Sequence, residues 1–189
     1  MAPLLQNMVI ILLIMVPLIT MRLFAEERAN CTDELLLTSP VETLEITLGK
    51  FLGAGLFYLV LLGCTLVYAG ILLYFGDPEV GTIVTGYLGL LLVGLSFIAL
   101  GLFTSTLTSN QIVAAVSAFV VLLLFFAIGW PASTVGENAG AVLGYLSLIE
   151  HFQPMTAGLV VSSDVIYFLS VIAFALFLSQ RSLESLRWR

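Results

Sequence analysis

The strongest constraint on this chain is a long stretch without charge, because no Asp, Glu, Lys, Arg or His occurs between Glu79 and Glu137. One helical crossing of a bilayer core takes about 20 residues, so this stretch must cross at least twice. Only 10% of the 189 residues are charged and 60% are hydrophobic, whereas about 25% of residues in soluble domains are charged. The chain is therefore predicted to be an integral membrane protein.

Five apolar runs have about the length of a membrane crossing. We expect an all-α integral membrane protein, a single transmembrane domain over 1–189, with transmembrane helices at about 4–23, 51–75, 82–103, 112–130 and 160–178. The last run is the weakest, since Ser162, Ser163 and Asp164 interrupt its beginning. Five crossings place the first polar segment and the C-terminus on the same side of the membrane.

The basic residues give the orientation. They occur in two groups, one between the first two runs and one in the C-terminal tail: Arg22, Arg28, Lys50, Arg181, Arg187 and Arg189. Cytoplasmic loops carry an excess of Lys and Arg. We therefore expect a cytoplasmic C-terminus, an outside N-terminus and a cytoplasmic segment over 24–50. An odd number of crossings is required for both groups to be cytoplasmic.

The connection over 131–159 is expected to be external and not simply a solvated loop. Its apolar pieces, 141–149 and 155–161, are too short to cross and are separated by the polar stretch 150–154. We predict two short interfacial or re-entrant helices here.

The cytoplasmic segment contains two helix-start patterns. Ser39-Pro40-Val41-Glu42 is a capping box with proline at the first helical position, so a helix is predicted to start there and continue through Lys50 into the second run. Thr32 is suited to cap a second, short helix whose first residues are acidic and whose apolar side is supplied by leucines. A short helix between two crossings is positioned to transmit movement from a soluble protein.

Several functional classes are poorly supported. The net charge of −6 argues against nucleic-acid binding, which requires clustered Lys and Arg. Cys31 and Cys64 lie in unlike surroundings, so neither a disulfide nor a metal pair is expected. The Gly49-Lys50 pair is followed by Phe51, and the chain carries no Gly-x-x-x-x-Gly-Lys-Ser/Thr phosphate loop.

Longer strings in the chain resemble a known family. The strings are PLITMRLFAEER from Pro17, TDELLLTSPV from Thr32, LGKF from Leu48, EHF from Glu150 and DVIYFLS from Asp164. Together they closely resemble ABC-2 type transporter permeases, and the nearest subgroup is the gliding-motility and copper-processing type. The resemblance covers nearly the whole chain.

The resemblance implies a function and partners. In that family the stretch matching 26–37 is a coupling helix that docks into a cytosolic ABC ATPase. The docking residues would be Glu26, Glu27, Arg28, Thr32, Asp33, Glu34, Leu35 and Leu36. The resemblance also implies a second permease subunit, a plasma membrane (bacterial inner membrane) location among lipids, and ATP as a cofactor of the ATPase alone, with no catalytic, cofactor or metal site in this chain.

Two features depart from the family pattern. Family members usually begin with an amphipathic helix and one further crossing, so this chain looks truncated at its N-terminus. Cys31 also stands where the family favours Gly before Thr.

Two other classes of function remain open. A non-transporting membrane scaffold would share the docking segment, and only ATP-dependent flux would separate it from a transporter. An intramembrane enzyme would need a nucleophile, a base and an orienting group. The single histidine, His151 beside Glu150, is interpreted as structural rather than as a base or metal ligand.

Overall fold

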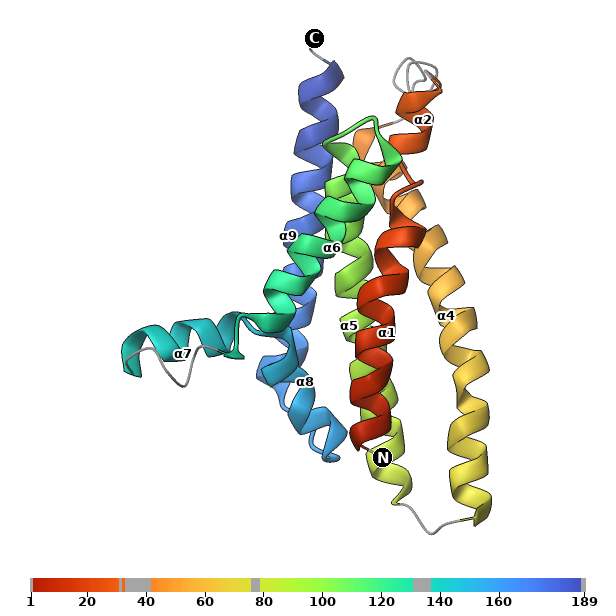
Figure 1. Cartoon of the computed structure of the whole chain (residues 1–189), viewed down its shortest axis with the longest axis vertical. Coiled ribbons are helices and arrows are strands. Elements are labelled where there is room, and N and C mark those ends of the chain that lie inside the picture. Colours follow the sequence, from red (N-terminus) through yellow and green to blue (C-terminus); the bar gives the residue numbers. More distant parts are fainter. Residues whose placement is uncertain (1, 31, 33–41, 76–78, 131–136, 188–189) are drawn as a thin grey trace.

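The computed structural model describes residues 2–30, 32, 42–75, 79–130 and 137–187. These residues form helices joined by turns (Figure 1). The helices are α1 (Ala2–Thr20), α2 (Ala25–Ala29), α4 (Thr43–Phe75), α5 (Val80–Thr106), α6 (Gln111–Ala127), α7 (Glu137–Leu146), α8 (Leu148–Thr156) and α9 (Ser162–Arg187). The predicted all-helical class therefore agrees with the described part of the chain.

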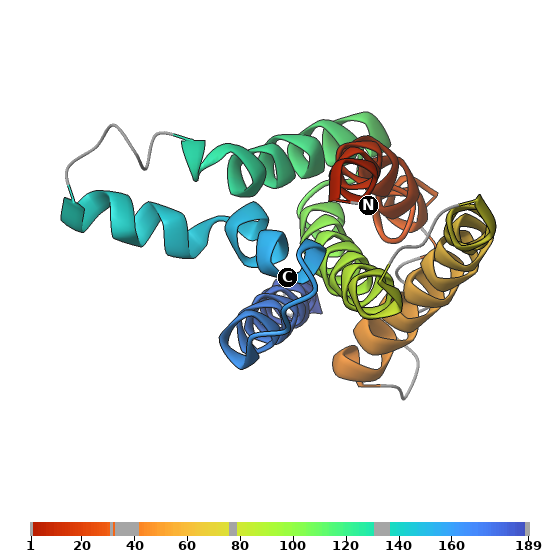
Figure 2. The ribbon, with the colours of Figure 1, turned by 90° about the horizontal axis from the view of Figure 1, so that it is seen from below.

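Helix α5 lies at the centre of the bundle, and α1, α4, α6, α8 and α9 pack around it (Figure 2). In the most apolar stretch of α5, 72% of the residues are buried, compared with 11% in α4. The face of α4 that turns away from the bundle is apolar, with Leu56, Val60 and Val67 more than half exposed. Such a face suits lipid rather than water.

Glycines on α5 allow neighbouring helices to approach closely. A Cβ atom on Gly94 would lie 2.2 Å from the ring of Tyr58, and one on Gly101 would lie 2.3 Å from the hydroxyl of Thr20. Tyr58 uses this space to donate its hydroxyl hydrogen to the carbonyl of Leu90 at 2.6 Å. Small residues that let two helices approach closely are typical of helix packing in membranes, where the hydrophobic effect does not drive helices together.

Four of the five expected crossings meet the length and hydropathy of a membrane-spanning helix, namely α1, α4, α5 and α9. Helix α6 has 17 residues, which corresponds to about 25 Å at 1.5 Å per residue and is shorter than a typical core of about 30 Å. The fifth crossing therefore stays a prediction. The expected end of that run at residue 130 is too late, because the α-helix ends at Ala127.

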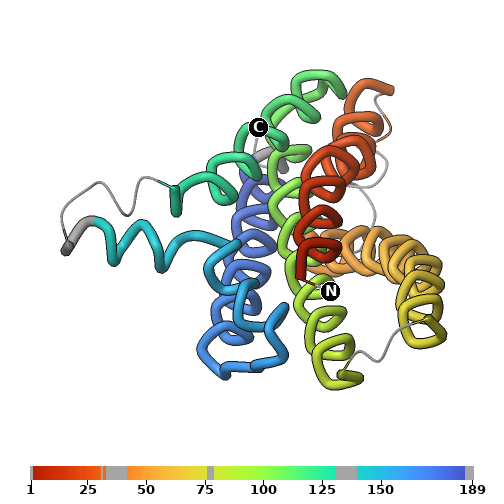
Figure 3. The backbone as a smooth tube through the Cα atoms, turned by 60° about the horizontal axis from the view of Figure 1, so that its bottom comes forward, coloured from red at the N-terminus to blue at the C-terminus, as the bar shows by residue number. Residues whose placement is uncertain are grey.

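The two short helices expected in the external connection are present, but their boundaries differ from the prediction. Helices α7 and α8 meet at Ser147, and the polar stretch predicted to separate them lies inside α8. Apolar content alone misplaced the break, because His151 of α8 is buried against a polar partner. In Figure 3, α7 projects sideways from the bundle and α8 returns the chain to it.

Other boundaries also shifted. The expected first crossing over 4–23 ends earlier, at Thr20, where residues 21–24 form a turn. The continuous helix through Lys50 is confirmed from Thr43 onward, but Glu42 is not helical and its carbonyl accepts from the N–H of Ile46. The predicted capping residues Ser39, Pro40 and Val41, like Cys31, lie outside the described residues.

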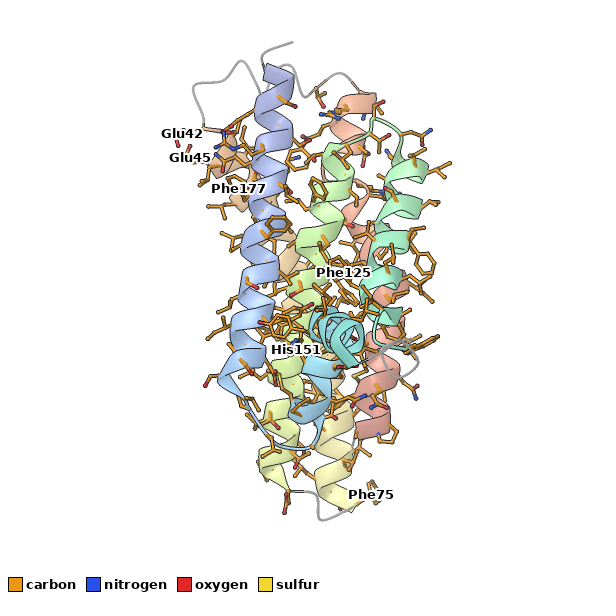
Figure 4. The ribbon with its side chains drawn as sticks, turned by 90° about the vertical axis from the view of Figure 1, so that its left-hand side faces the viewer. Glu42, Glu45, Phe75, Phe125, His151 and Phe177 are labelled. Atoms are coloured by element: carbon orange, nitrogen blue, oxygen red, sulfur yellow. The ribbon has the colours of Figure 1, made fainter. Side chains whose placement is uncertain are left out.

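The polar segment and the C-terminal helix lie at the same end of the bundle. The end of α1, all of α2, the start of α4 and the end of α9 gather at the upper end in Figure 1. Glu42 and Glu45 are labelled there in Figure 4. This arrangement agrees with an even number of crossings between the two groups of basic residues, as the expected total of five would give.

Candidate functional site

The predicted docking residues fall partly within the described chain. Glu26, Glu27 and Arg28 lie on α2 and are half-buried, whereas Asp33, Glu34, Leu35 and Leu36 lie outside the described residues. Thr32 is exposed, and its hydroxyl donates to the carbonyl of Glu27 at 3.1 Å. This bond satisfies a carbonyl in the last turn of α2.

A single buried hydroxyl attaches the turn before α2 to the central helix. Ser105 of α5 is fully buried, and its oxygen accepts from the N–H groups of Phe24 and Ala25, each at 3.1 Å. The same hydroxyl donates to the carbonyl of Met21 at 3.2 Å. The three bonds satisfy a carbonyl just after the end of α1 and two N–H groups at the start of α2, which the helices themselves leave unpaired. They fix the entry to α2 relative to α5.

A lysine attaches the same region to α4. Lys50 lies 2.6 Å from a carboxylate oxygen of Glu27, donates to the carbonyl of Leu23 and stands 4.3 Å from the ring centroid of Phe24. Its side chain is only 16% exposed. A partly buried ammonium with three favourable neighbours is held more firmly than a surface ion pair. Helix α2 is therefore joined to both α4 and α5.

These contacts join α2, where the predicted docking residues begin, firmly to the bundle. Thr20 packs against Gly101 of α5 immediately before the turn, and Ser105 follows one helical turn later on α5. A force applied to α2 would thus reach the buried central helix through short, defined bonds. This geometry is suited to transmitting movement and supplies no reactive group.

A second polar cluster lies in the other half of the bundle, where α8 meets α9. His151 Nδ1 lies 2.8 Å from Asp164 Oδ1, and Nε2 lies 2.9 Å from the carbonyl oxygen of Tyr145. The two side chains are 11% and 8% exposed. Tyr167 of α9 stacks on the imidazole with ring centroids 4.0 Å apart and donates to the carbonyl of Leu146 at 2.7 Å. In Figure 4, His151 lies in the half of the bundle away from Glu42 and Glu45.

A cavity of about 350 Å³ opens beside this cluster, lined by Gly140, Ala141, Gly144, Tyr145, Glu150 and His151. The carboxylate of Glu150 lies close to two glycines, so that a Cβ on Gly144 would be 2.6 Å from one oxygen and a Cβ on Gly129 would be 3.0 Å from the other. Glu150 is exposed. Its charge therefore faces the cavity rim rather than the buried pair.

Both ring nitrogens of His151 face other acceptors, so neither is directed at a serine or cysteine that it could activate. In the part of the chain that the structure describes, no group of three His, Cys, Asp or Glu residues is placed to hold a metal ion. The geometry agrees with a structural role for His151.

Sequence reasoning missed three residues that matter here. The sequence analysis gave Lys50 and Asp164 no contact with another helix: Lys50 served as an orientation signal and a helix-junction residue, and Asp164 as a weakness in the last run and the start of a family string. Ser105 lies in a stretch rich in serine and threonine, 104–109, and no local pattern singles it out. For Asp164 a signal existed, because an acidic residue in the first turn favours a helix start.

Comparison with known proteins gives one family match. The family model described as "ABC-2 family transporter protein" matches residues 3–179. No curated protein matches the chain.

Proposed function

Because the chain belongs to the ABC-2 transporter family, we propose that it is the transmembrane permease subunit of an ABC transporter and moves a substrate across or out of the membrane. ATP hydrolysis takes place in a separate cytosolic ABC ATPase, and a second permease subunit completes the membrane part. The resemblance to the gliding-motility and copper-processing type belongs to this proposal, as do the cytoplasmic C-terminus and the fifth crossing.

The observation that carries the proposal is the attachment of α2 to the bundle. A docking element that transmits the movement of an ATPase must not move independently of the helices it drives. The Ser105 bonds to the turn before α2 and the Lys50 contacts to Glu27 and Leu23 meet this requirement from two different helices. In this proposal, residues 26–37 contact the ATPase, and α4 and α5 receive the movement.

The first test is site-specific photocrosslinking in native membranes. A photoreactive residue replaces Asp33. In a control, the same residue replaces Glu79, which is exposed just before the start of α5, at the opposite end of that helix from Ser105. The proposal predicts that the Asp33 probe captures a cytosolic protein with a phosphate-binding loop and that the Glu79 probe does not. Failure of the Asp33 probe to capture such a protein would contradict the proposal.

A charge-reversal pair then tests the acidic residues. Replacing Asp33 and Glu34 by Lys is expected to weaken association with the captured ATPase while leaving membrane insertion intact. The matched control replaces Glu42 and Glu45 by Lys, which changes the net charge equally at exposed positions of the same polar segment. Equal binding by the wild type and the Asp33/Glu34 variant would remove these residues from the interface. ATP-dependent flux in the reconstituted complex would separate a transporter from a scaffold.

A further inference from the structure

We propose that the cavity beside α7 and α8 binds a small organic ammonium ion, with the carboxylate of Glu150 as its counterion. The cavity has a volume of about 350 Å³, which lies near the lower end of the range of ligand pockets, about 300–1,000 Å³. His151, which lines it, lies in the half of the bundle away from Glu42 and Glu45 (Figure 4). The site shares no residue with the predicted docking segment and is independent of the proposed ATPase partner.

The carboxylate of Glu150 has no counterion from this chain. In the part of the chain that the structure describes, it takes part in no hydrogen bond or ion pair. No Lys or Arg occurs between Lys50 and Arg181, and these two pair with Glu27 and Glu184. A cation that enters the cavity therefore competes with no basic side chain for Glu150.

Helix capping does not account for the side chains at the start of α8. The sequence from Ser147 to Glu150, Ser-Leu-Ile-Glu, has the pattern of a capping box. In such a box the glutamate binds the N–H of the serine, but the Ser147 N–H donates to the carbonyl of Gly144 at 3.0 Å. The Ser147 side chain makes no bond to the N–H groups of α8 either. Both side chains are thus left available for another partner.

The hydroxyl of Ser147 faces the same place as the carboxylate. Ser147 is 1% exposed, and its oxygen has no hydrogen-bond partner among the described residues. A Cβ on Gly129 would lie 2.7 Å from that oxygen and 3.0 Å from Oε1 of Glu150, so both oxygens stand around one point. A buried hydroxyl without a partner lowers stability. An ammonium group carries several N–H donors, so it can bind the carboxylate and the hydroxyl together.

The walls of the cavity suit an organic cation better than a metal ion. Tyr145 lines the cavity and is 62% exposed, and the face of a tyrosine ring attracts cations. A Cβ on Gly144 would lie 2.6 Å from Oε2 of Glu150, so the glycine keeps the space beside the carboxylate open. A Ca²⁺ ion takes about six to eight oxygen ligands. No group of three His, Cys, Asp or Glu residues is placed to hold a metal ion within the described ranges.

Ligand-observed saturation-transfer NMR tests the site on the full chain in dodecyl maltoside micelles, which carry no charge. The probe is ethylammonium chloride, and ethanol is a neutral control of similar size. We expect stronger saturation transfer to ethylammonium than to ethanol. Glu150→Gln should bind ethylammonium about tenfold more weakly, the loss expected for a hydrogen bond to a charged group. Glu79→Gln removes an exposed carboxylate just before α5 and should bind as the wild type does.

A second variant tests the space beside the carboxylate. Gly144→Ala should also weaken binding, because its Cβ displaces the carboxylate of Glu150. Gly63→Ala on α4 is the matched control, since a Cβ there meets no atom within 4 Å. Absence of saturation transfer to ethylammonium in the wild type would overturn the proposal, as would equal binding by the wild type and Glu150→Gln. If Glu150→Gln does not fold, equal binding by the wild type and Gly144→Ala would overturn it.

The ammonium group has two possible sources, a soluble amine and the ethanolamine headgroup of a phospholipid. Adding phosphatidylethanolamine or phosphatidylglycerol to the micelles distinguishes them. Loss of the ethylammonium signal with phosphatidylethanolamine alone supports the site and identifies a lipid headgroup as its ligand. An equal signal with both lipids supports the site and identifies a soluble amine.

Discussion

The bundle holds two of its short helices by different chemistry. At one end, the turn that leads into α2 is fixed by a hydroxyl, Ser105, and the helix itself by Lys50. In the other half, α8 is fixed by a buried side-chain pair, His151 with Asp164. The Ser105 attachment uses backbone groups of the turn, and the attachment of α8 uses two polar side chains.

This difference indicates what each attachment is suited to do. Hydrogen bonds between a hydroxyl and the backbone involve no side chain that titrates near neutral pH, so the joint between Ser105 and the turn before α2 does not depend on pH in that range. The contact of His151 with Asp164 joins two mostly buried side chains, so the loss of either one leaves a buried polar group without its partner. A joint to the backbone fits the proposed docking element, and a buried side-chain pair fits the packing of α8 against α9.

The largest effect is expected at the buried pair of His151 and Asp164. Replacing His151 by Phe leaves a buried carboxylate without a partner, which is expected to cost about 3 kcal/mol of the free energy of unfolding. The double variant His151→Phe/Asp164→Leu should recover most of that loss, because apolar replacements of a buried pair are often neutral. Unfolding in matched detergent micelles measures both. A double variant no more stable than the single one would contradict the buried pair.

Loss of the Ser105 hydrogen bonds should destabilise the protein less than loss of His151. Ser105→Ala leaves two N–H groups and one carbonyl without their partner, with an expected cost of about 2 kcal/mol after partial hydration of the turn. Ser96→Ala is the matched control, since Ser96 is equally buried on α5 and donates only to Leu92 within the same helix. Its cost should stay below about 1 kcal/mol. Equal losses for the two variants would show that Ser105 contributes only packing.

The Lys50 contacts should contribute less again. Lys50→Met keeps the aliphatic stem but removes the ammonium, which is expected to cost about 1 kcal/mol and to make stability less sensitive to salt. Arg181→Met is the control, because the pair of Arg181 with Glu184 lies on the exposed face of one helix. That variant should be nearly neutral. A larger loss in Arg181→Met than in Lys50→Met would contradict the attachment of α4 to α2.

The smallest effect concerns the aromatic neighbours of the imidazole. Tyr167→Phe keeps the stacked ring and removes the hydroxyl bond to Leu146, with an expected loss of about 1 kcal/mol. Tyr145→Phe should change stability little, because Tyr145 is 62% exposed and uses its backbone carbonyl, not its hydroxyl, to bind His151. Thermal unfolding of the two variants under the same conditions distinguishes the contribution of the Tyr167 hydroxyl from that of the Tyr145 hydroxyl. A greater loss in Tyr145→Phe would be contrary to this geometry.

Much of the helical framework was predictable, since long apolar runs leave few alternatives to membrane helices. The first and last residues of each helix were less predictable. The Ser162, Ser163 and Asp164 group resembles a weakness in an apolar run. Helix α9 nevertheless begins there, because an acidic residue stabilises a helix start and the buried Asp164 has a polar partner in His151. His151 lies on α8, whose boundaries the sequence analysis placed incorrectly.

Local sequence patterns could not predict the contacts that hold α2 to the bundle. Ser105 binds a turn about 80 positions earlier in the chain, and nothing in its neighbourhood distinguishes it from Thr104 or Thr106, whose hydroxyls bond within their own helix. Contacts of this kind depend on how helices pack. The docking residues inferred from family resemblance are placed only for Glu26, Glu27, Arg28 and Thr32.

The central claim is that the start of the docking segment is fixed to α5 through Ser105. Amide hydrogen exchange resolved at Phe24 and Ala25 in lipid nanodiscs tests it most directly, with Ser105→Ala and Ser96→Ala measured under the same conditions. The account predicts slow exchange at both amides in the wild type and in Ser96→Ala, and markedly faster exchange in Ser105→Ala. Exchange in the wild type as fast as in Ser105→Ala would contradict it.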